Sequence, residues 1–205
     1  MPNYVRSDTG LTLVELLVAM TIIGIVLGIT TTLFATTTRV FARETLAVEL
    51  QGDLAGAKNV FLDDVSIAGY SPDGDVDDPS DVFPTVSLAT NADSVSFIGD
   101  INSDGLSELI CYRLNGANLE RVIQDPGAAC NWANARSLAD AVESFNLTFL
   151  REDRSVATAA QVTGGEARAV QLSMVVAAPM HGMNISRTIT GEVAVRNCME
   201  SDLCN

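Results

Sequence analysis

The chain has 205 residues, and its 26 acidic against 12 basic residues give a formal net charge of −14 at pH 7. A chain of this length has room for one globular domain and a non-globular segment, because domains commonly take about 100–200 residues. The acidic balance disfavours binding to the phosphate backbone of nucleic acids, and it opposes adhesion to anionic lipid headgroups. Any contact with a membrane therefore has to come from a hydrophobic segment.

An apolar segment near the N-terminus meets that requirement. No charged residue occurs from Leu16 to Thr38, and this run is long enough for a helix that crosses a hydrocarbon core of about 30 Å. We predict a transmembrane helix over residues 11–38. A cleaved secretory signal is the alternative, but the run exceeds the roughly 7–15 apolar residues of a signal core, and no small-residue cleavage site follows it.

A second helical pattern continues from the first without a break. Apolar residues recur every three or four positions, whereas charged residues such as Asp63 and Asp64 are expected largely on the other side of the helix. We predict an amphipathic helix over residues 39–68, ended by the "GYSPDG" turn at residues 69–74. The apolar face comprises Leu50, Leu54, Ala57, Phe61, Val65 and Ala68.

The remainder, residues 69–205, has the period-two alternation of half-buried strands. Strands are expected around Val95, Leu109, Phe145, Leu172 and Val193. The "NG" pair at residues 115–116 predicts a hairpin turn, and "SLAD" at residues 137–140 is expected to cap one short helix. The predicted fold class is α+β, with a long N-terminal helix packed on an antiparallel sheet.

All four cysteines, Cys111, Cys130, Cys198 and Cys204, follow the apolar segment. An even count on one side of a membrane indicates an oxidising compartment, so we expect disulfides. A zinc site is the competing interpretation, but the only histidine, His181, is not spaced with the cysteines as zinc motifs require. Cys198 and Cys204 most simply pair with each other, which leaves Cys111 to pair with Cys130.

The loop "DINSDGLSE" has the spacing of a calcium loop. Alternating oxygen ligands followed by a glycine allow a chain to wrap a hard cation. The predicted ligands are the side chains of Asp100, Asn102, Asp104 and Glu108 and the backbone carbonyl of Leu106. The alternative is a polar β-turn rich in Asn, Asp and Gly. Calcium is the only cofactor that the sequence suggests. The single histidine has no recognisable nucleophile partner and no phosphate-binding glycine motif occurs, so we expect no enzymatic activity.

Glu15 is a carboxylate placed just inside the apolar region, where a bare charge is costly and is by default functional. Gly10, then "LTLVE", then the long apolar helix resemble the processing site of type IV pilins and related pseudopilins. The resemblance implies that residues 1–10 are a leader, that a prepilin peptidase cuts between Gly10 and Leu11, and that Leu11 is N-methylated. It also implies that Glu15 pairs with the N-terminal amine of a neighbouring subunit during filament assembly.

Three stretches of the second half, "FLDDVSIAGYSPDG", "GLSELICYRLNGANLERVI" and "GEVAVRN", resemble PilW-type minor pilins. This implies the pilin fold and a subunit that helps initiate or cap a type IV pilus. It also implies partner pilins, both minor and major, that bind through the N-terminal helix. The subunit would span the inner membrane once, with its globular domain in the periplasm, before joining a cell-surface pilus. A type II secretion pseudopilin and a membrane-tethered calcium-dependent adhesin or binding module remain as alternatives.

Overall fold

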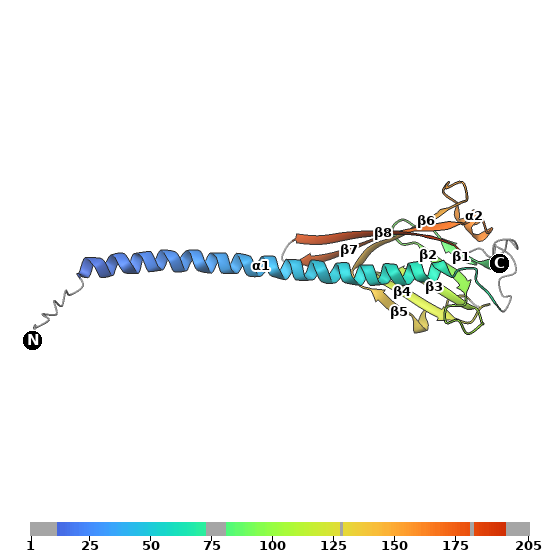
Figure 1. The fold of residues 1–205 in the computed structure, drawn as a ribbon, viewed down its shortest axis with the longest axis horizontal. Coiled ribbons are helices and arrows are strands. Elements are labelled where there is room, and N and C mark those ends of the chain that lie inside the picture. Colours follow the sequence, from blue (N-terminus) through green and yellow to red (C-terminus); the bar gives the residue numbers. More distant parts are fainter. Residues whose placement is uncertain (1–11, 73–80, 128, 181–182, 196–205) are drawn as a thin grey trace, which may run out of the picture. The chain divides into compact units, whose positions relative to one another are not determined.

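The structure is a computed structural model that describes residues 12–72, 81–127, 129–180 and 183–195. The chain divides into two compact units, Met1–Leu46 and Ala47–Asn205. Helix α1, Leu13–Ser66, is continuous through the boundary between them (Figure 1). The boundary falls inside the segment predicted as an amphipathic helix.

The first unit consists, in its described part, of the apolar half of α1. Its large apolar side chains are exposed, from Leu13 at 79% to Phe34 at 73%. By length and composition this helix can cross a membrane, and nothing in its most apolar 18-residue stretch is buried. The helix that the apolar run predicted is therefore present, with a surface that needs an apolar environment.

Threonines interrupt the apolar surface of α1, but the helix itself satisfies their hydroxyl groups. Thr32 Oγ1, for example, donates to the Gly28 carbonyl oxygen at 2.8 Å, four residues earlier. A hydroxyl bonded in this way needs no partner outside the helix, which is the condition for a polar group in hydrocarbon. Equivalent bonds to the preceding turn are made by Thr21, Thr30, Thr31, Thr36, Thr37, Thr38 and Thr45.

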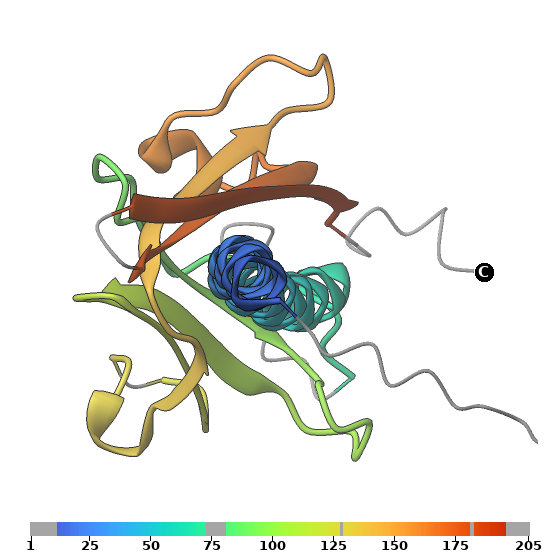
Figure 2. The same ribbon diagram turned by 90° about the vertical axis from the view of Figure 1, so that its left-hand side faces the viewer.

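In the second unit, the described strands form two antiparallel sheets. The first sheet has the order β1-β2-β3-β4-β5 and the second has the order β6-β7-β8. The part of α1 within this unit runs between the two sheets (Figure 2). The strands are β1 Thr85–Ser87, β2 Ser94–Gly99, β3 Glu108–Asn115, β4 Asn118–Gln124, β5 Arg136–Ala139, β6 Val142–Leu150, β7 Ala169–Met180 and β8 Met183–Ala194.

The core of this unit is centred on Phe61 of α1, which is completely buried. Its ring makes edge-to-face contacts with Tyr112 of β3 and Phe145 of β6, at centroid distances of 5.0 and 5.7 Å. One helix face thus contacts both sheets, and aromatic pairs of this geometry add to the gain from burial. The predicted apolar face is confirmed, since Leu50, Leu54, Ala57, Phe61, Val65 and Ala68 are all buried.

Two glycines let the strands approach α1 and the turn after it. A Cβ at Gly99, the last residue of β2, would lie 2.7 Å from the backbone oxygen of Ile67. A Cβ at Gly191 in β8 would lie 2.8 Å from Cδ1 of Leu62. Real Cβ atoms do not approach other atoms so closely, so a side chain at Gly99 would require the backbone to shift, whereas one at Gly191 would require the Leu62 side chain to move.

The two sheets are joined through Asp93, a buried carboxylate just before β2. Its oxygens accept the backbone N–H of Leu147 in β6 at 2.5 Å and that of Ala89 at 2.8 Å. Ala92 and Phe145 form a parallel bridge beside it. Burial raises the pKa of the Asp93 carboxyl above its ordinary value, and the two N–H donors act against that rise.

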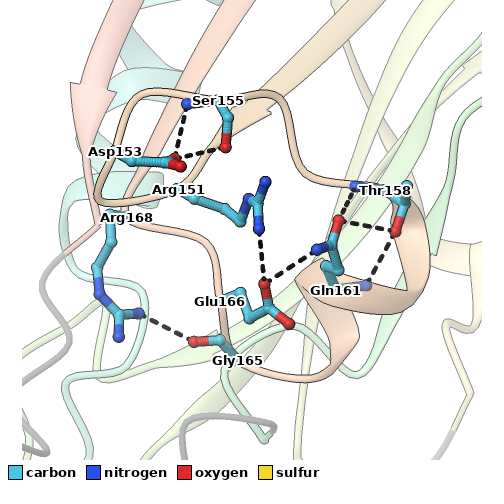
Figure 3. Close-up of polar contacts among 8 residues, drawn as sticks. All are labelled: Arg151, Asp153, Ser155, Thr158, Gln161, Gly165, Glu166 and Arg168. Atoms are coloured by element: carbon cyan, nitrogen blue, oxygen red, sulfur yellow. Dashed lines mark hydrogen bonds and ion pairs between the residues drawn. The ribbon is translucent and has the colours of Figure 1, made fainter.

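The connection between β6 and β7 is fixed by its own polar contacts (Figure 3). Thr158 caps the short helix α2, Ala159–Thr163, in a capping box with Gln161. The Gln161 side chain also donates to Glu166 at 3.1 Å, and Glu166 lies 3.6 Å from the guanidinium of Arg151. This box follows the Thr-x-x-Gln pattern of helix starts.

The predicted fold class is confirmed, since a long N-terminal helix is followed by antiparallel strands, but two details need correction. The strands form two sheets rather than one: β6 pairs with β7, and the segment before β2 meets β6 in the isolated bridge between Ala92 and Phe145 rather than in a ladder. The "SLAD" stretch is the end of strand β5 and not a helix cap, since Ser137 pairs with Glu120 of β4. The Ser137 hydroxyl does donate a hydrogen bond to the Asp140 side chain at 2.8 Å. The backbone there is nevertheless extended, because the segment pairs with β4. The Asn115–Gly116 turn is confirmed between β3 and β4.

Candidate functional site

The first candidate site is the start of α1, where Glu15 lies one turn from Thr12. Gly10 and Leu11, the predicted processing residues, lie outside the described residues. Thr12 immediately precedes the first helical residue, Leu13. Its backbone N–H and its hydroxyl donate to Glu15 Oε2 at 3.2 and 3.1 Å, and Glu15 N–H donates to Thr12 Oγ1 at 3.3 Å. This reciprocal arrangement is a capping box.

The sequence prediction for Glu15 named a partner in a neighbouring subunit and missed this one within the chain. The signal was readable, because Thr-x-x-Glu before an apolar run is the sequence pattern of a capping box. The box supplies hydrogen bonds to a carboxylate that stands in an apolar stretch. The same contacts satisfy N–H groups that the first turn of a helix otherwise leaves unpaired.

A second acidic residue of α1, Asp64, is buried in the globular unit with only 5% of its surface exposed. Its carboxylate accepts hydrogen bonds from Arg121 Nε at 2.6 Å and Arg121 Nη2 at 2.8 Å, and from the Tyr112 hydroxyl. The sequence expectation that Asp64 lies away from the apolar face was wrong. Its place three residues after Phe61 was the available signal, since that spacing keeps it on the buried stripe.

Burial dominates the electrostatics of this network. It raises the pKa of the Asp64 carboxyl above its ordinary value, while the bonds from Tyr112 and the charge of Arg121 act in the opposite direction. Burial and the neighbouring carboxylate also raise the pKa of Tyr112, so its phenol keeps the proton that it donates. The network fixes α1 to β3 and β4 through hydrogen bonds between groups that are buried or mostly buried.

The acidic loop between β2 and β3 is folded around its own backbone. The two carboxylate oxygens of Asp100 accept the N–H groups of Asp104 and Gly105 at 3.2 and 3.0 Å. The Asn102 side chain donates to Asp104 at 3.0 Å and to Glu108 at 2.8 Å. The loop thus brings together the four side chains predicted to bind calcium.

These contacts do not amount to a ready-made metal centre. Over the residues that the structure describes, no three His, Cys, Asp or Glu side chains gather closely enough to hold an ion. Calcium binding by Asp100, Asn102, Asp104, Glu108 and the Leu106 carbonyl stays a prediction, with the polar turn as its alternative.

Comparison with known proteins addresses the N-terminal site and the fold separately. The family model described as the prokaryotic N-terminal methylation motif matches residues 5–31, a range that includes Gly10, Leu11 and Glu15. A type IV-like pilin from Thermus thermophilus has a similar fold, with a TM-score of 0.50 and 12% sequence identity over 72% of this chain and 97% of that one. This chain combines a prokaryotic N-terminal methylation motif with a pilin-like fold.

Another similar structure belongs to a binary complex of two pseudopilins from the type 2 secretion system of Vibrio vulnificus. It is 13% identical, covers 73% of this chain and 98% of its own, and has a TM-score of 0.43. Among curated proteins, none matches this chain.

The predicted disulfide between Cys111 and Cys130 is present, with a sulfur–sulfur distance of 2.03 Å. The predicted pair of Cys198 and Cys204 lies outside the described residues. The bridge ties β3 to the segment that follows β4. In that segment the ring of Trp132 lies 4.1 Å from the guanidinium of Arg113, a cation–π contact that also holds it to β3.

Proposed function

We propose that this protein is a minor pilin, a structural subunit that helps to initiate or cap assembly of a type IV pilus. The main observation behind this proposal is the methylation motif over residues 5–31, which includes the beginning of α1. Leu11 would be the N-methylated first residue of the mature subunit after a prepilin peptidase removes residues 1–10.

The exposed apolar half of α1 supports an assembly role. The large apolar side chains of this helix from Leu13 to Phe41 are exposed, so lipid or another helix would have to cover them. The lipid of the inner membrane supplies that cover before assembly, and the helices of other minor and major pilins replace it in a filament. The globular unit would then lie in the periplasm and later on the cell-surface pilus.

Glu15 would control entry into the filament. Its carboxylate would pair with the positively charged N-terminal amine of a neighbouring subunit, which replaces a charge in lipid by an ion pair. A buried pair adds little net stability, but a mismatched subunit leaves a charge without its partner. The pairing therefore selects the correct register between helices.

The experiment compares a deletion strain, complemented with the wild-type gene or with the Glu15→Ala variant, for surface pili and for type II secretion. We expect lost piliation that the wild type restores, with Glu15→Ala inserted and processed but poorly incorporated. Glu49→Ala, which changes an exposed acidic residue on the same helix, is the control. Normal piliation with a secretion defect would instead identify a pseudopilin. Normal piliation and secretion would leave the calcium-dependent adhesin or binding module.

A further inference from the structure

We propose that Thr12 is a positioning residue that holds the Glu15 carboxylate in the conformation that receives the neighbouring amine. The inference rests on the proposed function, and it assigns a role to the residue that caps the start of α1. It follows from the three hydrogen bonds between Thr12 and Glu15, and from the fact that both bonds to the carboxylate use the same oxygen, Oε2.

The two bonds that the carboxylate accepts from Thr12 leave its other oxygen open. Both donors of Thr12 approach Glu15 Oε2, and in the described part of the chain no hydrogen bond to Oε1 accompanies them. An ionised carboxylate has about four acceptor positions over its two oxygens, so a bound Oε2 does not saturate it. The box consequently fixes the side chain and presents Oε1 to a further donor.

Fixing the side chain matters because a free glutamate has several rotamers, and ordering it at the moment of association opposes binding. The hydrogen bonds from Thr12 order the Glu15 side chain before the subunit meets its neighbour. Its hydroxyl has both roles, since it donates to Oε2 and accepts the N–H of Glu15. A valine at this position keeps the branched shape and the backbone N–H but loses both hydroxyl bonds.

The second capping box of the chain provides a matched control. Thr158 and Gln161 make the same reciprocal contacts at the start of α2, but the partner there is a neutral amide in the globular unit. Removing the hydroxyl of Thr158 therefore tests the loss of a box without a carboxylate. If the effect on assembly depends on Glu15, the Thr12 substitution should show it and the Thr158 substitution should not.

The experiment uses the full chain, expressed with its prepilin peptidase in the deletion strain, as wild type, Thr12→Val, Thr12→Ser, Glu15→Gln and Thr158→Val. The first readout is the fraction of processed subunit that enters sheared surface filaments. Thr12→Val should lower this fraction roughly fivefold, the ratio expected for loss of an N-cap hydroxyl. Thr12→Ser should stay within about twofold of wild type, because serine keeps the hydroxyl, and Thr158→Val should assemble normally.

The second readout is amide hydrogen exchange at Glu15 in detergent micelles, which does not depend on filaments. Thr12→Val should raise the Glu15 exchange rate about fivefold and Thr12→Ser should not. Glu15→Gln should keep the protection, since glutamine also forms a capping box, but should lose incorporation with the charge. Mass spectrometry of each variant checks that residues 1–10 have been removed, so that a defect in leader cleavage is not mistaken for a defect in assembly.

The outcomes separate the two proposals. Incorporation of Thr12→Val at the wild-type level, or an unprotected Glu15 amide in the wild type, would overturn the positioning role and leave the pilin function standing. Normal incorporation of Glu15→Gln would overturn the charge pairing of the proposed function while the exchange measurement still tests the box.

Discussion

Two acidic residues of the same helix, Glu15 and Asp64, are held in opposite ways. Glu15 is bonded by Thr12, three residues earlier, and its environment outside the helix is left to a membrane or a partner. Asp64 is bonded by Tyr112 and Arg121, which are 48 and 57 residues away, and it is enclosed by the chain itself. The comparison shows that one helix contains a region enclosed by the chain's own fold and a region whose apolar side chains are exposed.

The largest expected effect comes from opening the buried network. Asp64→Ala removes the partner of Arg121 and leaves a guanidinium uncompensated beside the core, which should lower the free energy of unfolding by about 3–5 kcal/mol. Denaturant unfolding of the full chain in detergent, followed by the fluorescence of Trp132, measures this loss. Asp63→Ala, at an exposed neighbouring position, is the control and should change it by less than about 0.5 kcal/mol. Equal stability of the two variants would show that the network contributes nothing.

Two glycine substitutions compare a position packed against the chain with an exposed position on α1. Gly99→Ala places a Cβ against the backbone oxygen of Ile67, an atom that cannot move aside alone, and should destabilise by about 1–3 kcal/mol. Gly52→Ala, on α1 with no atom within 4 Å of the new Cβ, should stabilise by about 0.5–1 kcal/mol through helix propensity. Unfolding midpoints of the purified variants give both values. Equal signs for the two changes would contradict the packing described.

The smallest expected effect concerns the acidic loop. Calcium should bind the folded loop only, and it should raise the thermal midpoint by a few degrees at concentrations above its dissociation constant. Magnesium should act weakly because it requires a tighter octahedral site. Melting curves in calcium, magnesium or chelator test this, with Asp104→Ala as the variant and the exposed Asp53→Ala as its control. Identical wild-type midpoints in calcium and chelator would identify the loop as a turn alone.

Much of the fold follows from local patterns. The change from a period near 3.6 to a period of two locates α1 and most strands, because each pattern depends on neighbouring residues and one buried face. The division into two sheets and the partners of Asp64 depend instead on residues far apart in the sequence. Asp93 is the clearest case, since nothing in its neighbourhood indicates that it bonds to Leu147 of β6.

The candidate sites divide in the same way. Glu15 stands out because a charge in an apolar run is rare, and the Thr12 partner was readable from the spacing. The loop at Asp100 is ambiguous for a physical reason, because Asn, Asp and Gly at alternating positions favour both tight turns and calcium ligation. The backbone N–H groups of Asp104 and Gly105 donate to Asp100, as in a tight turn. These bonds do not exclude calcium ligation by the same loop.

The most direct test of the central claim is mass spectrometry of the protein produced with its prepilin peptidase and recovered from membranes and sheared filaments. The account predicts a chain that has lost Met1 to Gly10 and begins with an N-methylated Leu11. An intact leader in the mature, filament-associated protein would contradict it.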